Sequence, residues 1–148
     1  MEPEKGRVLA LDVGTRRVGV AVSDPLRMTA QGGPTLERYP TKSFVESLAK
    51  LVVDWDIKEV AVGLPRGLNG RKGSTYDSVS ELIEELRNRW PDIRWTPWEE
   101  RFTTVEAVNV LKSAPRRKRR EKGARDRIAA QLILQSYLQF HDRDEELN

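Results

Sequence analysis

Apolar residues in the first part of the chain are grouped in short blocks, which is the pattern of buried β-strands. Residues 8–13 and 18–24 form two such blocks, each too short for a typical helix. Gly14-Thr15-Arg16-Arg17 separates the two blocks and predicts a hairpin turn. We expect a third strand at about 33–38, so the chain should open with an antiparallel meander.

Beyond residue 40, helical periodicity alternates with short apolar runs. In residues 41–55 and 75–89, apolar side chains recur three and four positions apart, which predicts helices with one buried face. The other expected elements are strands at 59–64 and 93–96 and helices at 103–112 and 124–140. Three leading strands followed by alternating strands and helices predict an α/β fold, in which helices flank a mixed five-stranded sheet. We expect one domain that spans residues 1–148, because this length suits a single core.

The composition restricts the chemistry that the chain can perform. It has no cysteine, which excludes disulfides, thiolate metal sites and a cysteine nucleophile. Its single histidine, His141, lies among charged residues and is a weak candidate for catalysis. Any hydrolysis should therefore rely on carboxylates and metal ions.

Asp12 is the most unusual carboxylate in the sequence. Every other residue of 8–13 is apolar, and strand alternation places Asp12 on the same face as Val8 and Ala10. A charged group inside a buried strand is costly unless it is paired or binds a metal ion. An Asp at the end of a strand that turns into a hairpin is also common, so a functional role and a purely structural role both stay open.

Two other carboxylates occur near the starts of predicted helices. Glu100 follows the fifth predicted strand and precedes the capping residue Thr103, and Glu99 competes with Glu100 for either role. Asp126 lies in the first turn of the last helix, on its apolar face. Each of these acids also suits a helix N-terminus for electrostatic reasons alone. If they converge with Asp12, the three carboxylates form an oxygen-ligand site for Mg²⁺ or Mn²⁺, and two such ions can promote hydrolysis of a phosphodiester.

Positive charge is concentrated in a basic segment at residues 112–127. Nine of these sixteen residues are Lys or Arg and two are acidic, whereas the rest of the chain has 17 basic and 21 acidic side chains. A concentrated positive charge attracts polyphosphates, although a solvated surface segment is the commoner explanation of a charge run alone. The segment includes Asp126, which favours phosphate contacts beside the expected carboxylate site.

The loop at 65–73 is a second candidate for phosphate contacts. It contains three glycines, which permit close approach of the backbone to a ligand. It also carries the basic residues Arg66, Arg71 and Lys72. An ordinary surface loop between a strand and a helix explains the same composition, so both interpretations stay open.

Four motifs, in order along the chain, resemble those of a known family. They are Leu11–Asp24, Val62–Pro65 with Asn69-Gly70, Trp98–Thr104 and Asp126–Leu138. In these motifs, which cover nearly the whole chain, the sequence resembles the YqgF family, also called RuvX. Members of that family are described as pre-16S rRNA nucleases and as Holliday junction resolvases. The resemblance implies an RNase H-like fold, a catalytic and metal-binding trio of Asp12, Glu100 and Asp126, and maturation of the 5′ end of 16S rRNA, with branched or single-stranded DNA as other substrates.

The sequence departs from the pattern of the family and its relatives at two positions. Glu99 stands where the family usually has an Asp, so we keep Glu99 as a reserve metal ligand. Ala129 stands one turn after Asp126, where related resolvases have a second acid. We expect the four tryptophans to lie mostly in the core, and Trp98 is the one that we also consider for stacking on a base. The expected nucleic-acid contacts are Arg16, Arg17, Arg66, Arg71, Lys72, Arg101, Arg116, Arg117, Lys118, Arg119, Arg120 and Lys122.

Two other functions are consistent with parts of the sequence. A non-enzymatic RNA-binding or ribosome-associated module would use the basic segment, but it leaves Asp12 unexplained. A kinase of the sugar-kinase and actin type also opens with an Asp-x-Gly-Thr hairpin, but it needs two such domains and this chain supplies one. We expect a cytoplasmic protein, because no apolar run has the length of a membrane span and no signal peptide is recognisable. Its expected partner is nucleic acid, either pre-rRNA or DNA, with no membrane contact, and it should be a monomer or a homodimer.

Overall fold

The computed structural model describes a series of strands and helices in the predicted order. It describes residues 6–64, 74–99 and 124–147, with side chains at 6–64, 76–99 and 127–141. The elements are β1 (Arg7–Val13), β2 (Arg17–Ser23), β3 (Ala30–Glu37), α1 (Thr41–Asp54), β4 (Ile57–Leu64), α2 (Ser74–Arg89), β5 (Arg94–Glu99) and α5 (Ala124–Leu147). None of the helices in the described part of the chain combines the length and apolar character that crossing a membrane requires. The helix predicted at 103–112 lies outside the described residues.

The five strands form one mixed sheet in the order β3-β2-β1-β4-β5. β2 pairs antiparallel with both β1 and β3, whereas β4 pairs parallel with both β1 and β5. β1 is therefore central, and its C-terminal end lies at the same edge as the C-terminal ends of β4 and β5. We call this the catalytic edge because Asp12, a candidate catalytic residue from the sequence, lies near this end of β1; the hairpin from β1 to β2 and the end of β3 also lie there. The predicted mixed five-stranded sheet is confirmed.

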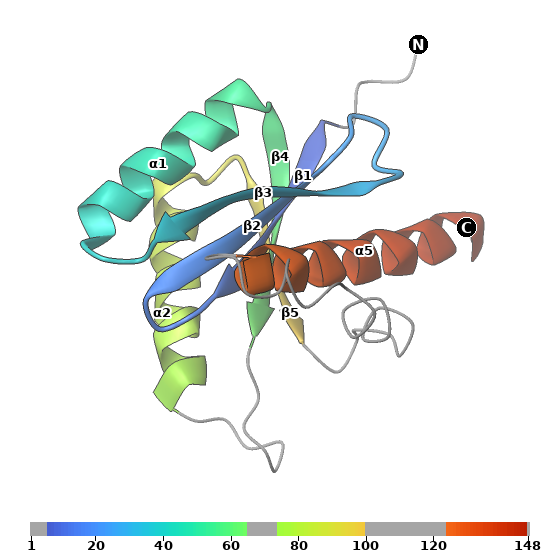
Figure 1. Cartoon of the computed structure of the whole chain (residues 1–148). Coiled ribbons are helices and arrows are strands. Elements are labelled where there is room, and N and C mark those ends of the chain that lie inside the picture. The colour runs from blue at the N-terminus through green and yellow to red at the C-terminus, as the bar shows by residue number, and fades with distance from the viewer. Residues whose placement is uncertain (1–5, 65–73, 100–123, 148) are drawn as a thin grey trace.

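Helices cover both faces of the sheet (Figure 1). α1 and α2 lie against one face, and α5 crosses the other. On β1, Leu9 and Leu11 pack in the core beneath α1 and α2, whereas Val8 and Ala10 pack beneath α5. The alternation predicted for this strand is confirmed, and it places Asp12 on the α5 face.

α5 approaches the sheet closely because the residues beneath it are small. Buried alanines of β1, β2 and β4 form most of this surface, and Gly63 extends it at the end of β4. A Cβ atom added at Gly63 would lie 2.5 Å from Cδ1 of Ile133, far inside normal contact distance. A larger side chain at Gly63 would therefore require Ile133 to change rotamer or α5 to move away from β4, the strand beside Asp12.

A polar network fixes the C-terminal half of α5 near the edge of the sheet opposite to the catalytic edge. The Tyr137 hydroxyl donates a hydrogen bond of 2.6 Å to Oε2 of Glu59 on β4. Arg27 donates to Oε1 of Glu59 at 3.1 Å and, through Nε, to the Gly6 carbonyl at 3.0 Å. The network joins α5, β4, the start of β1 and the β2–β3 connection, and it therefore fixes the position of the helix on the sheet.

Candidate functional site

Asp12 lies near the end of the central strand, at the catalytic edge. Its neighbours in the sheet are Gly19 on β2 and Gly63 on β4. Neither glycine has a side chain, so the sheet positions on both sides of the half-buried Asp12 carboxylate present only backbone. A carboxylate held in this way on a rigid strand is a suitable fixed oxygen ligand for a metal ion.

The structure describes the backbone of the second expected acid, Asp126, in the first turn of α5. Ile133, which lies against Gly63, is seven positions further along the helix. Residues seven positions apart lie on the same face of an α-helix, so Asp126 lies on the helix face turned toward the sheet. This backbone position agrees with the expectation from the sequence, and the Asp126 side chain is outside the described part.

Glu99 ends β5 and pairs with Leu64, which belongs to the core beneath α1 and α2. This pairing places Glu99 on the opposite face of the sheet from Asp12, and one of its carboxylate oxygens, Oε2, is buried there. The structure therefore does not bring the reserve ligand to Asp12. Glu100, the next residue, lies outside the described residues.

The metal-binding trio as a whole is not contained in the described residues. Within these residues there is no group of three His, Asp or Glu side chains that could hold a metal ion. Of the trio, only the side chain of Asp12 is described, so the trio stays a prediction. The expected nucleic-acid contacts outside the described residues are Arg66, Arg71, Lys72, Arg101, Arg116, Arg117, Lys118, Arg119, Arg120 and Lys122.

Two expected nucleic-acid contacts, Arg16 and Arg17, do lie at the catalytic edge. Arg16 is exposed in the β1–β2 turn, and Arg17 is half-buried at the start of β2. Arg17 lies two positions from Gly19, the partner of Asp12, and therefore on the same face as that carboxylate. Both arginines are placed where a phosphate near Asp12 would need positive charge.

Arg38 supports this turn and was not found from the sequence. Its backbone N–H donates to the Arg16 carbonyl at 2.8 Å, and its Nη1 donates to the Gly14 carbonyl at 2.9 Å. Nη2 donates to the Ser78 hydroxyl on α2. The Arg38 residue is only 7% exposed, so its guanidinium is a buried cross-link between the turn after Asp12 and α2. Charged residues are common in this sequence, and no sequence pattern distinguishes the buried one.

The structure places Trp98 in the core and rules out the stacking role that the sequence left open. Trp98 is 6% exposed and donates a hydrogen bond to the Ser136 hydroxyl at 3.2 Å. Its ring packs edge-on against Tyr137 and Phe140, with centroids 5.1 and 5.3 Å away. His141 completes this aromatic cluster, with its ring centroid 4.2 Å from that of Tyr137. The cluster is a structural contact between β5 and α5, and the weak candidacy of His141 for catalysis agrees with its place there.

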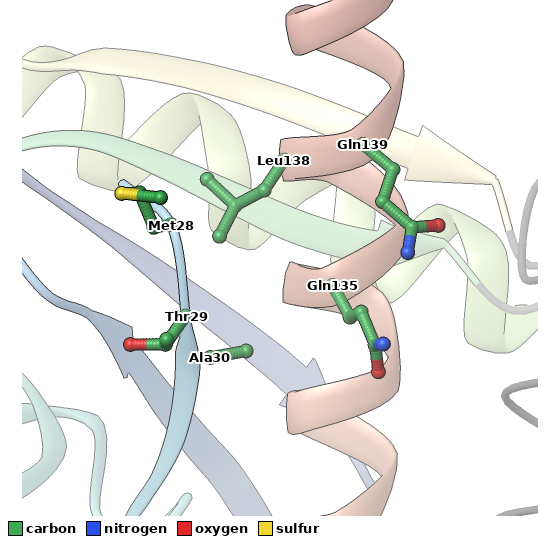
Figure 2. A pocket seen from close by; sticks show the side chains of 6 residues that line it. All are labelled: Met28, Thr29, Ala30, Gln135, Leu138 and Gln139. Atoms are coloured by element: carbon green, nitrogen blue, oxygen red, sulfur yellow. The ribbon is translucent and has the colours of Figure 1, made fainter. Parts of the chain in front are cut away.

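A pocket of about 310 Å³ lies between α5 and the start of β3. Figure 2 shows side chains from both elements around it, with Leu138 of α5 pointing toward Met28. Its lining residues are Met28, Thr29, Ala30, Gln135, Leu138 and Gln139. Because β3 runs toward the catalytic edge, its start lies at the opposite edge, and the pocket is separate from Asp12.

Comparison with known proteins identifies relatives over nearly the whole chain. The model of the RuvX family, described as Holliday junction resolvase, matches residues 6–140. Two relatives named "Putative pre-16S rRNA nuclease", from Koribacter versatilis and Rubrobacter xylanophilus, are 41% and 42% identical to this chain. The alignments cover 97% and 95% of this chain and 94% and 97% of those proteins.

Solved structures show the same fold at low sequence identity. RuvC of T. thermophilus, solved in complex with a Holliday junction substrate, has a TM-score of 0.54 and 14% identity; the match covers 91% of this chain and 96% of RuvC. The fowlpox virus Holliday junction resolvase has a TM-score of 0.53 and 12% identity, over 90% of this chain and 98% of that protein. The fold is therefore RNase H-like, as the sequence resemblance implied.

Proposed function

The chain belongs to the RuvX family, and from this membership we propose that it is a nuclease that hydrolyses phosphodiester bonds with the help of divalent metal ions. The observation that carries the proposal is the position of Asp12. This carboxylate is half-buried on the central strand of an RNase H-like sheet, between two glycines and beside the arginines of the β1–β2 turn. A charge on a buried strand is costly unless it is paired or binds a metal ion, and metal-dependent hydrolysis uses carboxylates as metal ligands.

In the proposed site, Asp12, Glu100 and Asp126 hold Mg²⁺ or Mn²⁺ through carboxylate oxygens. Their donor atoms suit these hard cations, and the chain has no cysteine that would favour a softer metal. When bound, the ions supply an activated water and stabilise the leaving oxygen of the phosphodiester. The protein contributes the fixed position of Asp12, and the arginines at 16 and 17 hold the phosphate in register.

The substrate that we propose is the 5′ end of pre-16S rRNA, with branched or single-stranded DNA as the alternative. The names of the relatives from Koribacter versatilis and Rubrobacter xylanophilus support the RNA substrate. The description of the family model supports a Holliday junction. Arginine contacts to phosphate do not distinguish RNA from DNA, so the choice between substrates requires an experiment.

The decisive experiment compares cleavage by the wild type with cleavage by Asp12→Asn, in Mg²⁺ or Mn²⁺. The substrates are a pre-16S rRNA fragment, single-stranded DNA and a four-way DNA junction. We expect Asp12→Asn to abolish cleavage of every substrate that the wild type cuts, because the variant loses a charged metal ligand. Thermal unfolding of both proteins shows whether the fold is retained.

Asp92→Asn is the matched control for this experiment. Asp92 is exposed and precedes β5, so it lies at the edge of the sheet opposite to Asp12. This variant should cleave at the wild-type rate. Cleavage by Asp12→Asn at the rate of the control would contradict the proposal. Tight binding without cleavage by all three proteins would instead support a non-enzymatic RNA-binding module, the function that the basic segment at 112–127 favours.

A further inference from the structure

Tyr39 is an exposed aromatic side chain at the catalytic edge. Among the described residues the exposed aromatic side chains are Tyr39, at 59%, and Phe140, at 46%, and Phe140 packs against Trp98 in the aromatic cluster. Tyr39 lies two residues after the end of β3 and next to Arg38, which bonds to the turn between β1 and β2. The ring therefore lies beside the turn that follows Asp12.

The Tyr39 ring is held from both sides along the chain. The Arg38 guanidinium lies over the ring, with its Cζ 5.3 Å from the centroid, and is itself fixed by its bonds to Gly14 and Ser78. Pro40, which begins α1 as its N-cap, restricts the backbone of the preceding residue to extended conformations. A ring held in this way loses little conformational freedom when a ligand binds.

Although the Arg38 cation lies over the ring, Tyr39 stays largely accessible to a ligand. The Arg38 cation occupies one face, and the ring nevertheless belongs to a residue that is 59% exposed. Flat ligands stack on exposed aromatic faces, and nucleobases do so whatever their sequence. Because a buried cation lies behind the ring, an apolar protein segment is a less suitable ligand for this aromatic face.

We propose that Tyr39 is a stacking platform for an unpaired base of the nucleic-acid strand that the catalytic edge binds. The proposal deepens the proposed nuclease function and rests on it. The exposed Arg16, whose carbonyl accepts the bond from Arg38, supplies a positive charge for the backbone phosphate of the stacked nucleotide. A base in a duplex is already stacked on its neighbours, so this platform selects single-stranded or frayed substrate next to the cleavage site.

The test measures binding in the presence of a chelator, so that no strand is cut. The probe is a short single-stranded RNA that carries 2-aminopurine at each position in turn, and a blunt RNA duplex is the comparison. We expect the fluorescence of 2-aminopurine to be quenched at one position by the wild type and by Tyr39→Phe, which keeps the ring. Tyr39→Ala and Tyr39→Leu should lose this quenching and bind the single strand about 5- to 150-fold more weakly. The affinity for the duplex should change less than about twofold, which is the usual effect of a surface substitution that leaves the charges intact.

Met28→Ala is the matched control, because Met28 is 75% exposed and lies at the edge of the sheet opposite to Tyr39. It should bind both probes like the wild type. The proposal is overturned if Tyr39→Ala binds the single strand as the wild type does, or if it weakens single strand and duplex equally. Base quenching through Tyr39 without any cleavage in Mg²⁺ or Mn²⁺ would refute the nuclease function alone. Cleavage without such quenching would refute the stacking platform alone.

Discussion

Gly63 connects the packing of α5 with the position of Asp12. It pairs with Asp12 in the sheet, and a Cβ atom at this position would lie only 2.5 Å from Cδ1 of Ile133. Gly63→Ala should therefore lower the free energy of unfolding by about 1–3 kcal/mol, because the added methyl overpacks the interface. Urea unfolding of the purified variant measures this loss.

Ile133→Val provides the control, since it removes the one atom with which the new methyl collides. Alone it should cost about 0.5–1.5 kcal/mol, as the loss of a buried methyl usually does. In the Ile133→Val background, Gly63→Ala should cost little, so the double-mutant cycle should give a clear favourable coupling. Additive losses would mean that the helix yields elsewhere and that Gly63 does not set its approach.

At the level of single residues, the sequence revealed Asp12 but not its surroundings. Asp12 was visible because a charge inside an apolar strand contradicts the local pattern. Arg38 and Tyr39 follow one another, yet one is 7% and the other 59% exposed, and this contrast arises only from tertiary packing. A stacking role for Trp98 stayed open for the same reason, since no local pattern shows that the second half of α5 covers this residue.

At the level of elements, the polar contact between α5 and β4 makes stability depend on pH. Burial alone raises the pKa of Glu59, but the hydrogen bond from Tyr137 and the Arg27 charge outweigh burial and hold this pKa below its usual value. A carboxyl with a lowered folded-state pKa stabilises the fold above its unfolded-state value of 4.5, and this contribution is lost as the pH falls through the folded-state pKa. Burial and the bond to Glu59 raise the pKa of Tyr137 to about 12, so its contribution is full below pH 10 and is lost as the pH rises from 10 toward 12.

Tyr137→Phe tests this contact, because it removes the hydroxyl and leaves the ring. We expect the free energy of unfolding near pH 7 to fall by about 1–3 kcal/mol, the usual cost of losing a buried hydrogen bond to a charged group. Between pH 7 and pH 3 the variant should lose stability less steeply than the wild type, because Glu59 has lost a bond that lowers its pKa. Tyr39→Phe, at an exposed ring, should follow the wild-type curve; parallel curves for Tyr137→Phe and the wild type would contradict the assignment.

The described elements have the predicted types and order, but some boundaries differ, at the end of α5, which runs to Leu147 and not to 140, and at two edge strands that contain proline. β3 begins at Ala30 and not at about 33, and β5 continues through Pro97 to Glu99 and does not stop at 96. Both strands are edge strands, where a residue without an N–H can face away from the ladder. In β3 the Gly33-Pro34 pair falls at a register shift, so residues that predict a turn are accommodated as a bulge.

At the level of the whole molecule, the two edges of the sheet carry different groups of side chains. The catalytic edge carries Asp12, the arginines of the β1–β2 turn and Tyr39. The opposite edge carries the network of Arg27, Glu59 and Tyr137, which fixes α5. α5 crosses the sheet from the catalytic edge to the opposite edge. The packing of α5 at the opposite edge therefore also determines where its first turn, with Asp126, meets the sheet.

The distribution of charge completes this division and gives a last prediction. Outside the basic segment the chain is mildly acidic, so binding of nucleic acid should depend on that segment more than on net charge.

The triple variant Arg116→Gln, Arg117→Gln and Lys118→Gln should weaken binding of RNA and DNA alike. On single-stranded RNA it should lower the slope of log affinity against log salt by up to about 2, the value for three lost phosphate contacts. The control, Lys50→Gln, Lys58→Gln and Arg89→Gln, removes the same charge from exposed positions on α1, β4 and α2. If both triple variants change the slope equally, the interaction depends on total charge, and the basic segment has no special part in it. A change confined to the first variant assigns the phosphate contacts to residues 116–118. Because these residues are near Asp126 in the sequence, their contacts would then lie along the path of the substrate.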